Sequence, residues 1–369
     1  MKYVDDFRDG RLARALRAQI AREVDPARTY RLMEFCGGHT HAIFRFGLAD
    51  LLPANVEMVH GPGCPVCVLP RGRVDMAIEL AMRPEVVLCA YGDMLRVPGS
   101  RRRSLLQAKA AGADVRMVYS AADALAVARA EPAREVVFFA IGFETTTPPT
   151  AVALARAIDE GLRNFSVVCN HVLTPPAIAA ILGDPAGAAI DGVLGPSHVS
   201  VVIGADAYGF VAADYGVPVV IAGFEPLDVL QSILMLIRQL NAGRAAVENQ
   251  YTRAVTAAGN AKAQALTARL FERRAAFEWR GLGEIPASAL RLRAEVAAFD
   301  AERRYDLADR PVRENRACRC PDILRGAAKP HDCSLFGGVC TPENPIGACM
   351  VSAEGACAAY WAYRRHLAA

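Results

Sequence analysis

Apolar and polar positions alternate in blocks up to about residue 228, and these blocks predict strands and helices in turn. Short apolar runs, typical of buried strands, occur in two series. Stretches with helical spacing separate them, an alternation that favours parallel sheets covered by helices. Strands are predicted at 30–35, 55–59, 85–91 and 115–119, then at 136–141, 165–170, 190–194 and 218–222; helices are predicted at 5–24, 73–82, 104–111, 150–160, 175–182 and 199–211.

The fold class expected from this pattern is α/β, with two similar domains that each hold a four-stranded parallel sheet flanked by helices. Residues 228–304 are rich in Ala, Arg and Leu and predict helices, apart from a break at 281–286. Pro, Gly and Cys dominate after Arg310, which predicts a loop-rich segment held by metal. The expected division is an N-terminal helix at 1–28 packing with the C-terminal domain, α/β domains at 29–128 and 129–228, and a C-terminal domain at 229–369.

Small and polar residues follow nearly every predicted strand. The first strand ends at Phe35-Cys-Gly-Gly-His, and the next at His60-Gly-Pro-Gly-Cys. Ligands of open α/β sheets bind outside the carboxyl ends of the strands, so these loops predict one polar cleft. Gly37 and Gly38 predict a tight turn that brings the backbone close to a ligand. We expect the Cys36 thiol to be accessible in this cleft, with His39 and His41 within reach.

Composition excludes several classes of protein. The 369 residues are 53% hydrophobic and 22% charged, with a formal net charge of +3, and no Lys/Arg-rich block interleaves with aromatics to suggest nucleic-acid binding. No apolar run approaches the roughly 20 residues that span a bilayer. The charged start, Met1-Lys-Tyr-Val-Asp-Asp, lacks the apolar core of a signal peptide. We therefore expect a cytoplasmic protein with no membrane partner.

Eleven cysteines in a reducing compartment indicate metal or redox chemistry rather than a disulfide framework. Three lie near the front, and six crowd the last 52 residues. Cys89 and Cys169 lie in apolar strand-like runs and are predicted to be small buried hydrophobes. The remaining nine are Cys36, Cys64, Cys67, Cys318, Cys320, Cys333, Cys340, Cys349 and Cys357.

Cys64 and Cys67 form a Cys-x-x-Cys motif. This spacing suits a dithiol/disulfide pair and also half of a zinc site, but no second pair lies nearby, so redox chemistry is favoured. A helix beginning near Arg71 could lower the thiol pKa through its N-terminal dipole.

The C-terminal cysteines carry the most specific pattern. Cys318, Cys333, Cys340 and Cys357 are separated by 14, 6 and 16 residues. Four thiolates in a loop-rich segment suit a [4Fe-4S] cluster or a structural zinc ion, and the spacing does not choose between them. Two further cysteines leave the ligand set open, and Cys320 could replace Cys318.

Taken together, the motifs resemble the HypD family of hydrogenase maturation factors over essentially the whole chain. The motifs that carry the resemblance are Phe35-Cys-Gly-Gly-His-Thr, Gly61-Pro-Gly-Cys-Pro-Val-Cys, Tyr91-Gly-Asp-Met-Leu-Arg-Val-Pro-Gly, Gly142-Phe-Glu-Thr-Thr, Gly195-Pro-Ser-His-Val-Ser, Gly223-Phe-Glu-Pro and the tail from Cys340-Thr-Pro-Glu-Asn-Pro through Met350-Val-Ser-Ala-Glu-Gly-Ala-Cys357.

The resemblance implies a scaffold that assembles the iron centre of [NiFe] hydrogenases. Members hold an Fe(CN)2CO fragment together with the small partner HypC, receive cyanide from HypE, and pass the unit toward the hydrogenase large subunit. The resemblance also implies a [4Fe-4S] cluster in the C-terminal part, with Cys318, Cys333, Cys340 and Cys357 as its expected ligands. It makes Cys36 the iron ligand and His39 functionally important.

Further polar residues are candidates for supporting roles. His39 could hydrogen-bond a cyanide nitrogen or move a proton. Glu144 and Glu225 could contact the bound fragment or act as helix caps and structural acceptors. The same alternatives hold for His171 and His198. His60 could tune the redox properties of the dithiol or pack against its loop.

A redox relay is the mechanistic hypothesis, in which the cluster supplies electrons and the Cys64/Cys67 dithiol accepts or stores them. The alternative is an iron–sulfur-dependent protein disulfide reductase, which leaves Cys36 without an obvious task. A third interpretation is a zinc-stabilised interaction module without redox activity.

Overall fold

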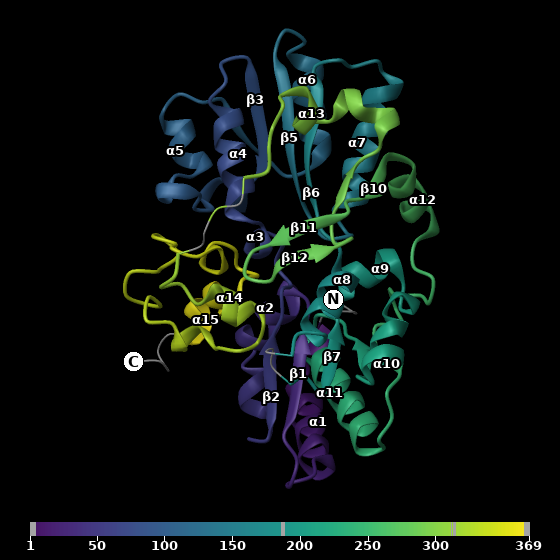
Figure 1. Ribbon diagram of the computed structural model, residues 1–369. Helices are drawn as coiled ribbons and strands as arrows, with labels where there is room; N and C mark the ends of the chain where they lie inside the picture. The colour runs from purple at the N-terminus through teal and green to yellow at the C-terminus, as the bar shows by residue number, and fades with distance from the viewer. Residues whose placement is uncertain (1–4, 186–188, 311, 313–314, 365–369) are drawn as a thin grey trace.

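Two α/β units and a cysteine-rich tail make up the computed structural model, which describes residues 5–185, 189–310, 312 and 315–364. One unit, built on sheet B, occupies the upper part of Figure 1, and the other, built on sheet A, occupies the lower part. The tail, in yellow, lies at one side of their junction (Figure 1). This arrangement confirms the predicted α/β class with parallel sheets flanked by helices.

Sheet B is parallel and four-stranded, with the order β4-β3-β5-β6. Successive side chains point to opposite faces. Phe138 and Ala140 therefore pack into one apolar cluster, whereas Val137 and Phe139 pack into the other, and all four are fully buried. Burial on both faces is typical of parallel sheets. The elements are β3 (Val86–Tyr91), β4 (Val115–Val118), β5 (Glu135–Gly142), β6 (Phe165–His171), α4 (Arg71–Ala81), α5 (Leu105–Ala110), α6 (Ala121–Ala130) and α7 (Thr147–Asp159).

Sheet A is parallel with the order β2-β1-β7-β8-β9. Its first strand is again covered on both faces. Leu32 packs with Ile20 and Ile233, whereas the adjacent Met33 packs with Ile178. The elements are β1 (Tyr30–Glu34), β2 (Val56–His60), β7 (Gly192–Gly195), β8 (Val219–Ile221), β9 (Val247–Asn249), α1 (Gly10–Glu23), α8 (Thr174–Leu182), α9 (Ser197–Ile203), α10 (Gly209–Tyr215) and α11 (Pro226–Asn241).

The grouping of four consecutive strands in each domain is wrong. Sheet A combines β1 and β2 with β7, β8 and a fifth strand, and sheet B combines β3 and β4 with β5 and β6. The chain begins one unit, builds the other, and then returns, so residues 29–128 and 129–228 each contribute to both sheets. Strand β7 pairs with β1 so that Gly192 lies opposite Leu32. Gly192 of β7 leaves room for Leu32, because a Cβ on this glycine would lie 3.0 Å from Leu32 Cδ2.

The prediction of continuous helix over 228–304 is wrong in its middle. Helix α11 is followed by β9, a further helix and four short strands that form two antiparallel pairs. Phe277 and Trp279 are buried while Glu278 between them is exposed, a strand periodicity too brief to stand out in an alanine-rich stretch. The elements are α12 (Ala261–Leu270), β10 (Phe271–Arg273), β11 (Ala276–Trp279), β12 (Gly283–Pro286), β13 (Leu290–Leu292) and α13 (Ala301–Arg304).

Two contacts hold the ends of the chain to the α/β units. Helix α1 packs along α11, so the N-terminal helix contacts the start of the predicted C-terminal range. Helix α15 (Ala356–Arg364), which contains the last cysteine, Cys357, packs against α2 (Gly37–Arg45). This second contact places the loop-rich tail beside the end of β1. The other short helices near the cysteines are α3 (Pro65–Val68) and α14 (Cys320–Leu324).

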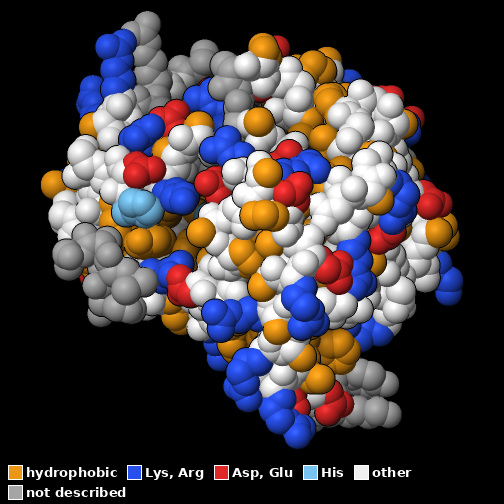
Figure 2. All heavy atoms as spheres, turned by 90° about the horizontal axis from the view of Figure 1, so that it is seen from below, with side chains coloured by type: hydrophobic (Ala, Val, Ile, Leu, Met, Phe, Trp, Pro, Cys, Tyr) orange, Lys and Arg blue, Asp and Glu red, His pale blue; other side chains and the backbone are white. Residues whose placement is uncertain are grey.

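Charged side chains of both signs are mixed on the face of the molecule that is seen from below (Figure 2). They are interspersed rather than gathered into one basic stripe. Among the described residues, no helix combines the length and the apolar character needed to cross a bilayer.

A buried ion-pair network fixes the 300–309 segment to the unit of sheet B. The Arg73 guanidinium, with 2% of its side chain exposed, lies 2.6 Å from the Glu302 carboxylate and donates to Asn170 at 2.6 Å. Arg274 pairs with the same carboxylate at 2.6 Å. Burial opposes ionisation of Glu302, but the two guanidinium groups outweigh it and lower its pKa to about 2.

Glu302→Gln is expected to lower the free energy of unfolding by about 3 kcal/mol at neutral pH, because Arg73 and Arg274 lose the buried carboxylate that they share. Arg73 then keeps only the more exposed Asp309 as a charge partner, at 2.9 Å. The folded-state pKa of Glu302 lies below its usual value of 4.5, so its contribution is complete above 4.5 and is lost as the pH falls toward about 2. Urea unfolding of wild type and variant at several pH values measures this gap, the difference between their free energies of unfolding. The exposed pair of Glu272 with Arg291 supplies the control, and Glu272→Gln should change stability by less than about 1 kcal/mol. A gap that is equal for the two variants, or independent of pH, would contradict the interpretation.

Candidate functional site

Cys36 lies where β1 ends and α2 begins, as predicted from the glycines and histidines that follow it. Only 7% of the residue is exposed, so the expectation of an accessible thiol is wrong. Its surroundings are polar rather than aliphatic. The Cys36 N–H donates to Glu34 at 2.9 Å, and the Gly37 N–H donates to the Gly63 carbonyl at 3.1 Å.

Two glycines allow the chain to close around Cys36. A Cβ on Gly63 would lie 2.6 Å from the Cys36 Cα, and a Cβ on Gly37 would lie 2.4 Å from the Cβ of Glu354. Gly37 is helical rather than part of a tight turn, so its role is close packing and not unusual backbone geometry. The dithiol loop and the C-terminal tail therefore meet at Cys36.

Electrostatics keep the Cys36 thiol protonated in the free protein. Burial raises its pKa to about 12, and the nearby carboxylates of Glu354 and Glu34 add to the effect. A metal ion would have to displace this proton, because the thiolate is the form that binds metal. Metal binding at this cysteine is therefore coupled to proton release.

His39 is fully buried on α2, with a fixed ring orientation. Its Nε2 lies 3.1 Å from the Ser197 hydroxyl and 3.1 Å from the carbonyl oxygens of Ala222 and Gly223. Two carbonyl acceptors require a proton on Nε2, so Nδ1 is the unprotonated nitrogen. Nδ1 is buried without a partner among the described residues, and burial lowers the pKa of His39 to about 4. This histidine is thus arranged to accept a hydrogen bond at Nδ1, while its burial disfavours a second proton on the ring.

Glu34 is a site residue that sequence reasoning missed, because it lies inside an apolar strand. It is fully buried and accepts hydrogen bonds from the Cys36 N–H, the Thr40 hydroxyl and His60 Nδ1, the last at 2.8 Å. Burial raises the pKa of Glu34, although these donors oppose the shift. Through Glu34, His60 is therefore hydrogen-bonded to the Cys36 loop. The sequence signal that could have identified Glu34 is a carboxylate two positions before a strand-end cysteine. Glu354 was also missed, for a different reason: it lies in the distant tail and reaches Gly37 only in the folded chain.

The Cys64/Cys67 pair lies on α3, one loop away from Cys36. Cys64 occupies the N-cap position, where its Sγ accepts from the Cys67 N–H at 3.3 Å. The expected lowering of the thiol pKa is wrong for Cys67, since burial raises its pKa well above the usual value. Its Sγ lies 3.9 Å from the Ala348 carbonyl of the tail.

Cys349 connects the dithiol to the C-terminal cysteines. Hydrogen bonds from the thiols of Cys320 and Cys67 lower its pKa to about 6 against the opposing effect of burial. Cys320 in turn raises the pKa values of Cys318 and Cys357 through its hydrogen bonds to them. The thiols thus form a continuous series from α3 into the tail.

The C-terminal thiols offer the soft donors that hold iron–sulfur clusters or zinc. The sulfur atoms of Cys318 and Cys320 both lie 2.6 Å from the place where a Cβ of Gly347 would stand, so this glycine leaves room for them. Cys340 Sγ accepts from the Ile346 N–H at 3.4 Å, and Cys333 Sγ lies 4.0 Å from the Ala317 carbonyl. Within the described residues, no three His, Cys, Asp or Glu side chains are arranged to hold a single metal ion.

The other candidates make contacts within the fold. Glu225 pairs with Arg8 and caps α11, which is the structural alternative considered for it. His171 Nε2 lies 3.0 Å from the Thr150 hydroxyl, and burial lowers its pKa to about 3. His198 stacks on an aromatic ring with the centroids 4.1 Å apart.

Comparison with known proteins settles the family. The model described as "HypD: Hydrogenase formation hypA family" matches residues 11–364. The chain belongs to the HypD family. It is 66% identical to the hydrogenase maturation factor HypD of Azotobacter vinelandii, over 99% of this chain and 97% of that protein. It is 60% identical to HypD of Cupriavidus necator, over 99% of this chain and 98% of that protein. It is 50% identical to HypD of Escherichia coli (strain K12), over 99% of each protein.

The resemblance drawn from the motifs is confirmed, and membership of the HypD family supports a role in hydrogenase maturation. The motifs that carried it converge in space. The loop of Cys36, the dithiol loop and the tail from Cys340 meet around the end of β1.

Gly63→Ala tests whether this convergence depends on the missing side chain. A Cβ so close to the backbone of Cys36 must displace it, and we expect a loss of about 2 kcal/mol in the free energy of unfolding. Gly209→Ala is the matched control, because its Cβ would meet nothing within 4 Å and its φ is −53°. The control should unfold at the wild-type temperature or slightly above it. Equal thermal stability of both variants would contradict the packing described.

Proposed function

We propose that this HypD-family protein is the scaffold on which the Fe(CN)2CO unit of [NiFe] hydrogenase is assembled and from which it is transferred. The observation that carries the proposal is the placement of Cys36 in a polar, closed site where three separate segments meet. Its thiolate is the proposed ligand of the iron, with a cysteine of a HypC-type partner as the second. A HypE-type protein would donate cyanide, the hydrogenase large subunit would receive the unit indirectly, and the process would take place in the cytoplasm.

The residues around Cys36 suit such a fragment. Iron carrying cyanide and carbon monoxide is a soft centre, for which a thiolate is a suitable ligand. The proton lost from Cys36 needs an acceptor, and the carboxylate of Glu354 is the proposed one. It is close enough to the thiol to raise the pKa of Cys36, and burial raises its own pKa. His39, one turn along the same helix, is proposed to accept a hydrogen bond at Nδ1.

A thiol relay is the second part of the proposal, and the series from Cys67 to Cys320 supports it. The thiolate of Cys349, favoured by its lowered pKa, attacks Cys67 in a Cys64–Cys67 disulfide and releases Cys64 as a thiolate. The thiolate of Cys320 then attacks Cys349 and releases Cys67. Two electrons have then moved to the Cys64/Cys67 pair, and a Cys320–Cys349 disulfide has formed.

A resident [4Fe-4S] cluster, when bound, would supply the two electrons, one at a time, that return the Cys320–Cys349 disulfide to two thiolates. Cys318, Cys333, Cys340 and Cys357 remain the proposed ligands. Under this assignment Cys320 and Cys349 are free for thiol exchange, which gives the two additional cysteines of the sequence a role. The contacts of Cys320 with Cys318 and Cys357 place the exchanging thiols beside two of the proposed ligands.

The same series of thiols favours one alternative, an iron–sulfur-dependent disulfide reductase acting on a protein dithiol. Iron content separates the two functions. The scaffold predicts about four iron atoms per chain after anaerobic purification alone and about five with the HypC-type partner, with visible cluster absorbance in both samples. A reductase predicts about four in both. Colourless protein holding zinc would contradict both and support an interaction module.

A further inference from the structure

Strand β2 forms one edge of sheet A, and the outer side of this edge is open. The order β2-β1-β7-β8-β9 gives β2 a single neighbour, and Figure 1 shows the strand below the yellow tail. The edge of a sheet presents unpaired N–H and C=O groups, which natural proteins shorten, bend, charge or cover to prevent pairing with other chains. An edge that stays open beside the Cys36 site therefore needs an explanation.

The register decides which backbone groups of β2 point outward. The Gly61 N–H donates to the Glu34 carbonyl at 2.9 Å, and Glu34 lies opposite His60. Successive residues of a strand turn their backbone groups to opposite sides, so the odd-numbered residues of 55–61 bond to β1. The N–H groups of Met58 and His60 therefore point away from β1, and no backbone hydrogen bond of the described residues uses them. These two residues offer free donors and acceptors at the spacing that an added strand requires.

A groove of about 650 Å³ follows this edge. The tail forms one wall, and α2 with the segment after it forms the other, which is largely apolar. Where the groove reaches His60, aromatic rings follow one another: the centroid of Phe44 lies 4.8 Å from that of His60 and 5.5 Å from that of Tyr360. The edge is thus recessed between two walls, which suits a single extended chain better than the edge of another folded sheet.

Lys329 is the charged group that the groove leaves unpaired. Asp50 pairs with Arg364, and Glu57 pairs with Arg31 at 3.2 Å, so both acids of the lining already have partners. Lys329 is exposed on the tail wall, and it forms no ion pair with any carboxylate of the described residues. The tail end of the groove therefore favours an acidic side chain.

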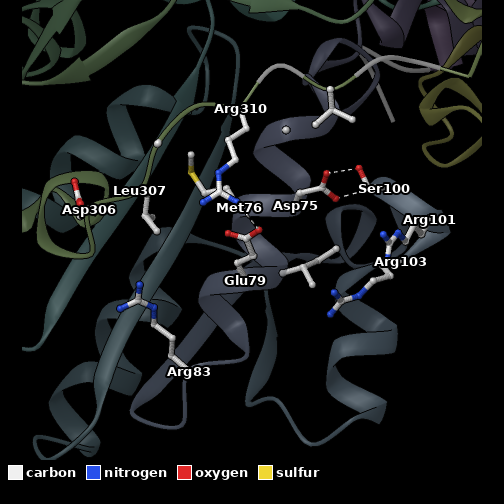
Figure 3. A pocket seen from close by; sticks show the side chains of 14 residues that line it. Asp75, Met76, Glu79, Arg83, Ser100, Arg101, Arg103, Asp306, Leu307 and Arg310 are labelled. Carbon is white, nitrogen blue, oxygen red and sulfur yellow. Dashed lines mark hydrogen bonds and ion pairs between the residues drawn. The ribbon is translucent and has the colours of Figure 1, made fainter.

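A cavity beside α4 lacks these features (Figure 3). Its lining comes from helices and loops rather than from a strand, so it presents no sheet edge. Its acidic groups also have partners nearby: Asp75 accepts from the Ser100 N–H and hydroxyl at 2.7 and 2.6 Å, and Glu79 pairs with Arg310 at 3.4 Å.

We propose that the groove along β2 binds an extended segment of a partner protein, which pairs with β2 as a sixth strand of sheet A. In such strand addition, main-chain hydrogen bonds supply affinity and pockets for alternate side chains supply specificity. Apolar side chains of the segment pack on the α2 wall, and an acidic one meets Lys329. The segment also contacts His60, whose Nδ1 lies 2.8 Å from Glu34, the acceptor of the Cys36 N–H. The inference does not depend on the proposed iron chemistry, because strand pairing is measured without metal.

Fluorescence anisotropy of the full chain with the labelled peptide fluorescein-Glu-Val-Thr-Val-Thr-Val-amide tests the pairing. Two isomers of this peptide, N-methylated at alternate residues, keep every side chain but lose the N–H groups of one edge or of the other. Only the isomer methylated on the edge that faces β2 should lose affinity, by at least about 10-fold. Equal affinity of the two isomers, or no saturation by the parent peptide at about 1 mM, would overturn the proposal.

Variants of the chain locate the bound peptide. Met58→Pro removes an outward N–H and leaves the bonds to β1, a position where edge strands accept proline, and it should weaken binding at least about 10-fold. Lys329→Ala should weaken binding about threefold at low salt and less at high salt.

Two tryptophan variants keep the test decisive if Met58→Pro does not fold. Ala54→Trp fills the groove from an exposed position and should abolish binding, whereas Ala18→Trp, exposed on α1 outside the lining, should leave it unchanged. Peptide binding that survives Ala54→Trp would contradict the assignment. A wild-type dimer in sedimentation that Met58→Pro dissociates would assign the edge to a second copy of the chain and also overturn the proposal.

Discussion

Cys36→Ala is expected to abolish hydrogenase maturation, with hydrogenase activity in the cell reduced by about 100-fold or more. Its sulfur is the only proposed protein ligand of the iron from this chain, and loss of groups that merely orient a ligand already costs about 10- to 100-fold. Truncating one small side chain should cost only about 1 kcal/mol of stability, so the loss would not reflect unfolding. The measurement is hydrogenase activity in a strain carrying the variant.

Cys89→Ala is the matched control for this prediction. Cys89 is also buried, and its replacement by Ala removes the same thiol group. It lies in β3, however, and faces the apolar cluster formed with α6 and α7. Its replacement should leave hydrogenase activity within about twofold of wild type, since it removes one apolar contact in a stable core. Normal activity of Cys36→Ala, or equal loss in both variants, would show that maturation does not use Cys36 as proposed.

Cys64→Ala is expected to abolish maturation while the visible absorbance of the [4Fe-4S] cluster stays intact. Without Cys64, Cys67 has no partner for a disulfide within its motif, so exchange with Cys349 has nowhere to begin. The cluster should persist because Cys64 is not among its proposed ligands. Activity assays and absorption spectra of the same preparation give both readouts.

The outcomes for Cys64→Ala separate the parts of the mechanism. Normal hydrogenase activity would refute the relay. Loss of cluster absorbance together with activity would assign Cys64 a structural or ligand role instead. Cys169→Ala, at a buried cysteine of β6, is the control and should change neither readout.

The sequence predicted individual elements better than their assembly. Each of the eight predicted strands is present, and Cys36 lies at the end of the first one as expected. Strand partners were not predictable, because parallel strands joined by long crossovers carry no local signal for which neighbour they choose. The pairing of β1 with β7 places Gly192 directly opposite Leu32, a contact visible only in three dimensions.

For the candidate site, too, local groups of residues were easier to predict than contacts between distant segments. Motif residues near one another in sequence, Cys36 with His39 and Cys64 with Cys67, could be grouped as candidates from their spacing alone. The contacts of Cys67 with Cys349 and of Gly37 with Glu354 join segments from opposite ends of the chain, so no spacing rule could reveal them. Burial of the Cys36 thiol was also unforeseen, because the tail that covers it comes last in the sequence.

Infrared spectroscopy tests the central claim most directly. The protein is purified anaerobically with its HypC-type partner, in wild-type and Cys36→Ala forms that have the same cluster absorbance. Cyanide and carbonyl stretching bands should appear for the wild-type complex and be absent for the variant. Bands of equal intensity in both samples, or in neither, would contradict a role of Cys36 as the anchor of the iron fragment.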